Sequence, residues 1–403
     1  MKKKVLFVIE SLACAGGEKS LTTLLNLFDY EKYEVDLQLF RYGGELQQLI
    51  PKTVKILPPL RYFEECEQKV SEQAINCVKS KQNIKEFICR IKYSVLLRRK
   101  KLGSFQQAIL FWKCSRKCFI NSNSNIEYDV AVAYAQGTPT FYVADCVKAK
   151  KKIAWINAIY SMNGEEKIFS EEIYSKFDKI SCVSEVSKDV FGECFPNLKK
   201  RLYVTKDIND GKMIEKMSEM YSLANEEMRS DKGEVKILTV GRFAYPKGYD
   251  IAVEACSILK KRGIIFKWFV LGKGPFEEQI KKDIIKKNVE EYFILLGVRA
   301  NPYPYFKNCD IYVQTSRVEG FGLTIAEART LNKPVVTTRF DAVFAQMIDG
   351  KNGLVVDMNA ESVANGVQKL IENRDLYDYI KEFQSHEKKS NYEELDRFYQ
   401  LIE

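Results

Sequence analysis

Short apolar runs rich in Val, Ile and Phe alternate with helical patterns along the whole chain, and this alternation restricts the possible folds more than any other feature. It predicts parallel strands joined by crossover helices. In the first half, the predicted strands cover residues 5–9, 35–40, 54–57, 130–134, 153–156, 180–183 and 202–204. In the second half, they cover residues 235–240, 266–271, 293–296, 311–314, 335–337 and 353–356. Each half is therefore expected to form a doubly wound α/β sheet.

The length of 403 residues indicates two domains, because a single core stops growing near about 250–300 residues. A polar stretch over residues 206–233 separates the two halves of the strand pattern. We therefore expect an N-terminal domain over 1–207 and a C-terminal domain over 208–380. A helix over 381–403 is expected to follow and to pack back toward the N-terminal domain.

The composition disfavours several classes of function. The eleven cysteines are scattered singly, and His386 is the only histidine. This inventory argues against a zinc site and a histidine-dependent triad, so neither a metal nor a cofactor is expected. Single thiols in a long chain without a secretory signal indicate a reducing cytosol. The apolar run 5–9 is too short for a signal peptide, and no run of about 18 apolar residues could span a membrane.

Basic residues crowd the segment 81–117, where Glu86 is the only acidic residue. Apolar residues are interleaved with them, a pattern that suits an anionic membrane surface. The same pattern also suits helices with a solvated basic face and an apolar side in the core, and composition leaves both alternatives open. Nucleic acid is not expected as a partner, since no recognised binding motif accompanies the charge.

A glycine-containing turn follows the predicted strand that ends at Gln314. The segment 316–328 has the sequence Ser-Arg-Val-Glu-Gly-Phe-Gly-Leu-Thr-Ile-Ala-Glu-Ala. Glycines let the backbone approach a ligand closely, and a helix that begins near Gly322 presents free N–H groups that suit a diphosphate. The predicted binding residues of this turn are Gly320, Phe321, Gly322 and Leu323.

Two glutamates flank this turn. Glu319 is expected in the loop, near the sugar of a nucleotide sugar, and Glu327 on the helix, where its carboxylate could accept hydrogen bonds from ribose hydroxyls. Alternatively, Glu319 caps the helix and Glu327 is a solvated helical residue. The glycines between them favour the binding site.

A second candidate element spans residues 240–250 and again follows a predicted strand. Arg242 offers a planar fork to phosphate oxygens, and Lys247 offers a mobile point charge. Together they could stabilise a departing diphosphate in place of a metal ion. The alternative is that either residue only caps a turn or pairs with Asp250.

Three further turns at strand ends carry candidate binding residues. The Gly-x-Gly turn at Gly272 and Gly274 is a weak signal that is compatible with a base-stacking loop. Arg299 could line a nucleotide pocket or merely pack its turn. In the first half, Gly16 and Gly17 permit close approach of a diphosphate or an acceptor, although paired glycines also form ordinary tight turns.

This combination resembles the retaining nucleotide-sugar glycosyltransferases of family 4, with the likeness strongest over residues 237–353. The matching residues are the paired Glu319 and Glu327, the cations Arg242 and Lys247, and the glycine turn at Gly16 and Gly17. The resemblance implies the GT-B fold, in which two Rossmann-like domains face a central cleft. The first domain would bind the acceptor and the second the nucleotide sugar, without a divalent metal.

Two positions depart from the family pattern. Asn157 stands where the family commonly has a histidine that contacts the donor sugar, and Gln136 stands where many relatives carry glutamate. Asn157 can donate and accept hydrogen bonds but cannot become cationic. Both residues are predicted substrate ligands, and both put the identity of the donor in question.

The resemblance implies a hexosyltransferase with Arg242, Lys247 and Glu319 as its catalytic residues. It would move a hexose or N-acetylhexosamine from a nucleotide diphosphate sugar, UDP-linked by family frequency, to a saccharide or lipid-linked acceptor of bacterial surface polysaccharide. Such an enzyme is expected in the cytoplasm, peripheral on the inner face of the plasma membrane. The alternatives are a catalytically impaired partner subunit, or a sugar-nucleotide epimerase, which the scarcity of histidine disfavours.

Overall fold

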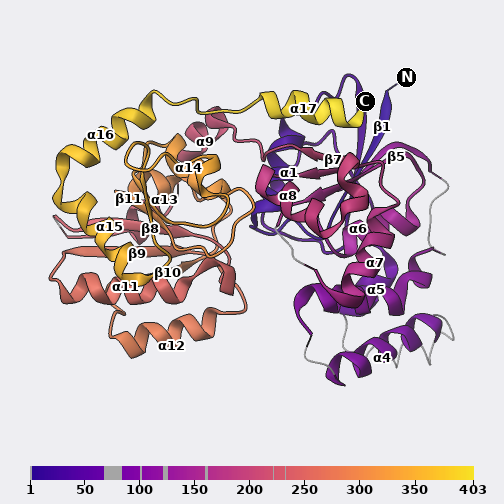
Figure 1. The fold of residues 1–403 in the computed structure, drawn as a ribbon, viewed down its shortest axis with the longest axis horizontal. Helices are drawn as coiled ribbons and strands as arrows, with labels where there is room; N and C mark the ends of the chain where they lie inside the picture. Colours follow the sequence, from indigo (N-terminus) through magenta and orange to yellow (C-terminus); the bar gives the residue numbers. More distant parts are fainter. Residues whose placement is uncertain are drawn as a thin grey trace. The chain divides into compact units, whose positions relative to one another are not determined.

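The computed structural model of the chain describes residues 2–67, 84–99, 102–120, 126–158, 162–220, 222–231 and 233–403. The chain divides into two compact units, labelled by element in Figure 1. The first comprises Met1–Lys206 with Leu395–Glu403, and the second comprises Asp207–Glu394.

The first unit contains, within its described residues, a seven-stranded sheet with parallel neighbours. The strand order is β3-β2-β1-β4-β5-β6-β7, so the chain winds from β1 to one edge and returns through β4 to the other. Its strands are β1 (Lys3–Ile9), β2 (Tyr33–Leu39), β3 (Lys55–Ile56), β4 (Tyr128–Ala133), β5 (Ala149–Ile156), β6 (Lys179–Cys182) and β7 (Leu202–Val204).

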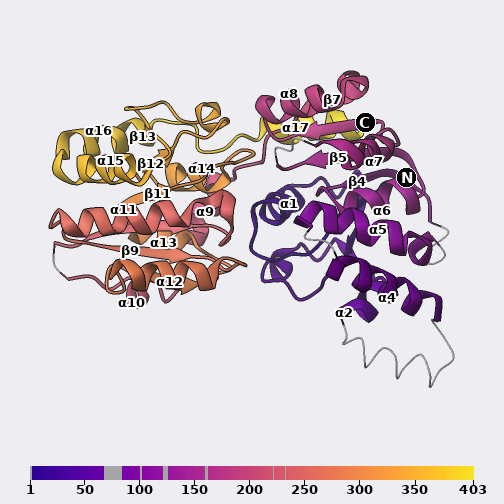
Figure 2. The ribbon, with the colours of Figure 1, turned by 60° about the horizontal axis from the view of Figure 1, so that its bottom comes forward.

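Both faces of this sheet are covered, which explains why β1 is apolar from Val5 to Ile9. In β1, Leu6 and Val8 belong to a core that includes Trp112 of α5 and Phe141 of α6. Helix α4 lies alongside α5 (Figure 2). The helices of this unit are α1 (Gly16–Asn26), α2 (Arg61–Glu67), α4 (Ile84–Arg99), α5 (Ser104–Ile120), α6 (Thr138–Cys146), α7 (Gly164–Tyr174) and α8 (Glu185–Cys194), followed by the last helix, α17 (Glu393–Ile402).

The last helix packs on the opposite face of β1. Phe398 of α17 is completely buried, and its ring stacks on Phe7 with 5.8 Å between the centroids. Its ring centroid also lies 6.0 Å from that of Phe28 and 5.8 Å from that of Trp155. The C-terminal segment is therefore an integral part of the core of the first unit.

The second unit has a six-stranded sheet in the order β10-β9-β8-β11-β12-β13, with parallel neighbours throughout its described part. Strand β8 lies between β9 and β11, which repeats the doubly wound arrangement. The strands are β8 (Val235–Val240), β9 (Phe266–Leu271), β10 (Phe293–Gly297), β11 (Ile311–Gln314), β12 (Val335–Thr338) and β13 (Leu354–Val356).

The helices of the second unit form two groups. Helices α11, α12 and α15 share a core with residues of β8, β9 and β11, whereas α9, α13 and α14 pack against one another (Figure 1). The full set is α9 (Gly211–Ser218), α10 (Ala224–Glu227), α11 (Tyr249–Lys261), α12 (Glu277–Lys287), α13 (Tyr303–Asn308), α14 (Leu323–Thr330), α15 (Ala360–Glu372) and α16 (Arg374–Ser385).

The predicted doubly wound sheets are confirmed, and every predicted strand is present. Strands β8, β9 and β11 have the predicted bounds, because each is a mostly apolar run that ends at a polar residue or is followed by a glycine. Among the described helices, none combines the length and the apolarity that crossing a bilayer requires.

We expect Phe398→Ala to destabilise the first unit by about 3–5 kcal/mol, the usual loss when a buried phenylalanine is truncated. Urea unfolding of the full chain, followed by far-UV circular dichroism, measures the change. Tyr379→Ala on α16 is the control, since Tyr379 is 49% exposed. Equal losses in the two variants would contradict a core position for α17.

Candidate functional site

Two loops of the second unit leave neighbouring strands at the same edge of the sheet. The loop after β8 carries Arg242 and Lys247, and the loop after β11 carries Glu319. The carboxyl ends of parallel strands on either side of a change in winding direction are where such sheets bind ligands. The structure brings two of the predicted residues into contact, with 2.6 Å between Lys247 Nζ and Glu319 Oε1.

Glu319 is held in one orientation by three donors. Its Oε1 accepts hydrogen bonds from Lys247 Nζ at 2.6 Å, Gln314 Nε2 at 2.8 Å and Ser316 Oγ at 2.6 Å. The glutamate side chain is 10% exposed. The alternative that Glu319 caps the following helix is wrong, because Gly322 is the N-cap of α14 and Glu319 accepts its hydrogen bonds from side chains of the described residues.

Gln314, the last residue of β11, connects Glu319 to the surrounding elements. Its Oε1 accepts hydrogen bonds from Tyr312 at 3.0 Å and from Thr324 in the first turn of α14 at 2.7 Å. Gln314 is 3% exposed, so each of these polar partners is needed to offset its burial. Sequence reasoning missed this residue, although a glutamine that ends an apolar strand is a usable signal.

The helix that was predicted to begin near Gly322 does begin there. Gly322 has a φ of +84°, a left-handed conformation that favours glycine, and α14 begins at the next residue. The side-chain amide of Gln346 donates to the carbonyls of Phe321 and Gly322 and so fixes the turn. Phe321 and Leu323 are each 8% exposed and pack inward.

Glu327 is a buried residue of α14. It is 1% exposed, and its Oε1 accepts a hydrogen bond of 3.1 Å from Tyr303 of α13. Burial and the neighbouring glutamate raise the pKa of the Tyr303 hydroxyl well above its ordinary value. The alternative of a solvated Glu327 is therefore wrong, while its role toward ribose stays a prediction.

Arg242 is exposed and forms no hydrogen bond or ion pair within the described part of the chain. Asp250, the partner considered for Arg242 and Lys247, instead binds Arg317 through two contacts of 2.8 Å and 2.6 Å. The Arg317 guanidinium holds the pKa of the Asp250 carboxyl below its ordinary value. The alternative in which Arg242 or Lys247 pairs with Asp250 is therefore wrong: Lys247 pairs with Glu319, and the Asp250 carboxylate pairs with Arg317.

The glycines at Gly272 and Gly274 have a packing role. A Cβ on Gly272 would lie 2.0 Å from the carbonyl oxygen of Gly241, and one on Gly274 would lie 2.4 Å from that of Phe243. The backbones after β8 and β9 therefore pack in direct contact. Base stacking at this turn stays a prediction.

Arg299 is engaged inside the second unit. It forms an ion pair with Glu227 of α10, and its Nε donates to the hydroxyl of Tyr305 at 2.8 Å. These contacts correspond to the turn-packing alternative for this residue.

In the first unit, three predicted residues meet at the ends of β4 and β5 and the start of α1. Gln136 Oε1 accepts hydrogen bonds from the backbone N–H groups of Asn157 at 3.1 Å and Ala158 at 3.0 Å. A Cβ on Gly17 would lie 3.0 Å from Asn157 Nδ2, whereas one on Gly16 would meet open space. Within the described ranges, Asn157 Oδ1 is buried without a hydrogen-bond partner. The cluster therefore offers one unused acceptor beside a glycine.

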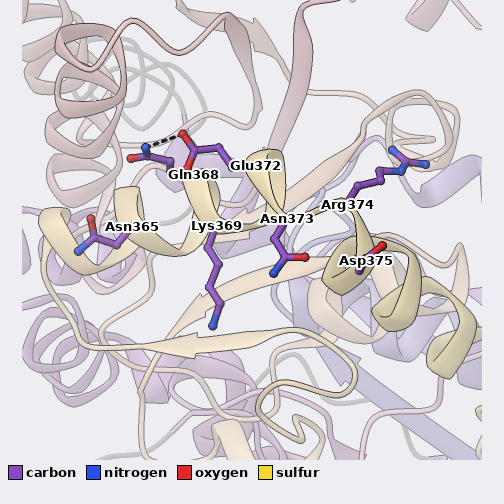
Figure 3. Close-up of a pocket in the computed structure, with 7 residues that line it drawn as sticks. All are labelled: Asn365, Gln368, Lys369, Glu372, Asn373, Arg374 and Asp375. Carbon is purple, nitrogen blue, oxygen red and sulfur yellow. Dashed lines mark hydrogen bonds between the residues drawn. The ribbon is translucent and has the colours of Figure 1, made fainter.

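A separate polar hollow lies at the junction of α15 and α16 (Figure 3). It is lined by Asn365, Gln368, Lys369, Glu372, Asn373, Arg374 and Asp375. None of the predicted site residues lines it. Among the residues that the structure describes, no group of three or more His, Cys, Asp or Glu side chains is arranged to hold a metal ion.

Sequence comparisons relate the chain to known glycosyltransferases. Residues 223–386 match the family model of the glycosyl transferases group 1. The chain is 30% identical over 203 residues to an uncharacterized glycosyltransferase of Methanocaldococcus jannaschii, covering 49% of this chain and 51% of the relative. It is 28% identical over 207 residues to the poly(glycerol-phosphate) alpha-glucosyltransferase of Bacillus subtilis, covering 48% and 31%. The chain thus spans about half the length, or less, of these curated relatives.

Solved structures are similar over nearly the whole chain. HepE of Anabaena, in complex with UDP-glucose, superposes with a TM-score of 0.67 at 17% identity, covering 99% of this chain and 98% of that one. A variant of TarM from Staphylococcus aureus, in complex with fondaparinux, alpha-GlcNAc-glycerol and UDP, gives a TM-score of 0.67 at 14% identity, covering 99% of both chains. These similarities confirm the predicted GT-B fold of two Rossmann-like units.

We expect Gly248→Ala to destabilise the second unit more than Gly263→Ala. Both glycines have left-handed backbones, with φ of +64° and +72°, where alanine costs about 1–2 kcal/mol. A Cβ on Gly248 would also lie 2.0 Å from the Thr315 carbonyl oxygen, whereas one on Gly263 would meet nothing within 4 Å. Urea-unfolding midpoints measure the difference, and equal shifts would show that the two loops do not pack as closely as described.

Proposed function

We propose that this protein transfers a hexose or N-acetylhexosamine from a UDP-linked donor to a saccharide acceptor during polysaccharide biosynthesis, because residues 223–386 match the family model of the glycosyl transferases group 1. The observation that carries the proposal is the contact of 2.6 Å between Lys247 and Glu319 at the end of β11. It joins a cation and an acid beside the start of α14, whose N–H groups and dipole suit a diphosphate.

Glu319 is proposed to bind and orient the donor sugar. Its Oε1 is occupied by three donors, and no hydrogen bond to its Oε2 is recorded among the described residues. A carboxylate anchored through one oxygen keeps the other in a constant direction, which is the preorganisation that a binding residue needs. Glu327, on helix α14 that follows the loop of Glu319, is proposed to accept hydrogen bonds from ribose.

Arg242 and Lys247 are proposed to stabilise the departing UDP without a metal ion. Negative charge develops on the leaving diphosphate as the glycosidic bond breaks, and fixed cations lower the barrier most at that point. For a retaining reaction, the acceptor hydroxyl would attack from the side on which UDP leaves, and its proton would pass to the leaving oxygen. No nucleophile from the protein is then needed.

In the first unit, Gly16, Gly17, Gln136 and Asn157 are proposed to bind the transferred sugar or the acceptor. The unused Oδ1 of Asn157 is proposed to accept a hydrogen bond from a sugar hydroxyl, and Gly17 lets the amide of Asn157 pack directly against the start of α1. A neutral amide at this position can donate and accept hydrogen bonds but supplies no positive charge to the ligand.

We expect Lys247→Ala to lower kcat by about 10²–10³-fold, as for the loss of one transition-state donor, with a much smaller change in donor affinity. UDP release from UDP-glucose and UDP-N-acetylglucosamine measures turnover, with and without EDTA. Lys307→Ala is the matched control, because Lys307 forms a similar ion pair of 2.6 Å with Glu219. Unchanged turnover in Lys247→Ala would exclude the proposed role.

The same assay separates the alternatives. A catalytically impaired partner subunit would bind UDP but release none from either donor. An epimerase would convert the sugar nucleotide without releasing UDP. EDTA is expected to leave turnover unchanged, and its loss on chelation would contradict the metal-independent mechanism.

We further propose that α4 docks on an anionic membrane that presents a lipid-linked acceptor. Its apolar side chains form an exposed stripe at helical spacing, whereas α5 turns its apolar side into the core. The stripe consists of Ile84, Ile88, Ile91 and Val95, which are 55%, 58%, 42% and 42% exposed. Exposed basic residues of the same helix are Lys85, Lys92 and Arg98. Of the predicted basic segment, Lys81, Lys100 and Lys101 lie outside the described residues.

Sedimentation with liposomes tests this proposal. We expect binding to phosphatidylcholine vesicles that contain phosphatidylglycerol and little binding to pure phosphatidylcholine, since each basic residue near an anionic surface contributes about 1 kcal/mol. Ile88→Asp should reduce the bound fraction severalfold. Ile285→Asp on α12 is the control, because Ile285 is 62% exposed in the other unit. Binding that ignores lipid charge, or equal effects of the two variants, would refute docking through α4.

A further inference from the structure

The turn that carries Lys247 is short and exposed, so something outside it must hold it in place. It consists of the 3-10 helix Tyr245–Lys247, and Tyr245 is 61% exposed. Three residues of 3-10 helix supply few hydrogen bonds of their own. The flexible side chain of Lys247 can contribute to a binding site only if the backbone of the residue is held in a fixed position.

The segment after β11 holds this turn through three successive carbonyl groups. Arg317 Nη1 donates to the carbonyl of Tyr245 at 3.1 Å, and the backbone N–H of Arg317 donates to that of Pro246 at 2.7 Å. Thr315 Oγ1 donates to the carbonyl of Lys247 at 3.1 Å. The backbone of the lysine turn is thus bound to the segment that also carries Glu319.

Arg317 adds a second attachment at the start of α11. Its guanidinium makes a two-pronged pair with Asp250, at 2.8 Å and 2.6 Å, and lies 4.4 Å from the ring centroid of Tyr245. The Arg317 side chain is 20% exposed. The side chain of Arg317, which itself belongs to the loop of Glu319, therefore contacts both the residue before the turn's proline and the helix after the turn.

We propose that Arg317 is a positioning residue that, together with Asp250, sets Lys247 to meet the diphosphate of the donor. This inference rests on the proposed function, because it assigns no contact of its own between Arg317 and the ligand. This positioning role requires the planar guanidinium of arginine. Lysine carries the same charge, but its ammonium cannot pair with both oxygens of Asp250, donate to the Tyr245 carbonyl and stack on the Tyr245 ring at the same time. Replacement by lysine should therefore disturb Lys247 without removing the local charge.

The chain offers a matched control in Arg374. This residue pairs with Asp378, with 2.9 Å between Nε and Oδ2, and its guanidinium lies 4.7 Å from the ring centroid of Tyr377. It combines the same three side-chain types on α16, away from the loops after β8 and β11. Arg374 makes one hydrogen bond to its aspartate and is more exposed than Arg317, so Arg374→Lys controls for the replacement of an aspartate-paired arginine over a tyrosine away from the site.

The experiment compares the affinities of the full chain for UDP and UMP by calorimetric titration. The ratio of the two isolates the second phosphate, which Lys247 is proposed to bind. Arg317→Lys should lower the affinity for UDP about three- to thirtyfold and leave that for UMP unchanged. Asp250→Asn should act in the same direction, and Arg374→Lys should change neither affinity.

A double-mutant cycle decides whether Arg317 acts through Lys247. In a Lys247→Ala background, Arg317→Lys should have no further effect on UDP. An equal effect in both backgrounds would overturn the positioning role, as would a parallel loss of UDP and UMP affinity. If the unaltered chain does not prefer UDP to UMP, or Lys247→Ala leaves that preference unchanged, the proposed function of Lys247 fails and the inference with it. Thermal midpoints of all variants identify any that fail to fold.

Discussion

The parallel pairing of β8 with β11 is the constraint on which the candidate site depends. Ile311 pairs with Ile237 and Tyr312 with Leu238, so the two strands end side by side. Because they are parallel, their carboxyl ends lie at one edge, and the loops that follow must leave the sheet together. The lysine turn and the glutamate loop meet for this reason, although Lys247 and Glu319 are 72 residues apart.

The need to compensate partly buried charges then determines the contacts between the two loops. A carboxylate that is 10% exposed must be compensated, and Glu319 receives a lysine, an amide and a hydroxyl on one oxygen. The lysine that compensates it needs a fixed backbone, which the segment 315–317 provides through three carbonyl groups. Glu319, Lys247 and the segment 315–317 therefore form one hydrogen-bonded network, and a substitution in one of them should alter the position of the others.

In the first unit, neutral amide side chains fix the loops at the strand ends. Gln136 uses one amide oxygen to hold two backbone N–H groups after β5, and Asn157 lies against Gly17. The apolar side chains of α4 and α5 differ in their exposure. Helix α5 packs on the sheet and buries Trp112, whereas the apolar stripe of α4 stays exposed. One basic segment thus contains both a core helix and a surface helix.

The sequence by itself determined the elements and the chemistry. Mostly apolar runs such as 235–240 and 266–271 predict strands because buried parallel strands need no polar alternation, and Gly322 marks the start of a helix after a strand. The tertiary structure alone decided the partners. Asp250 binds Arg317, 67 residues away, and Glu327 is buried against Tyr303. Periodicity and turn chemistry are local along the chain, whereas pairing and burial depend on which distant loops the strand order brings together.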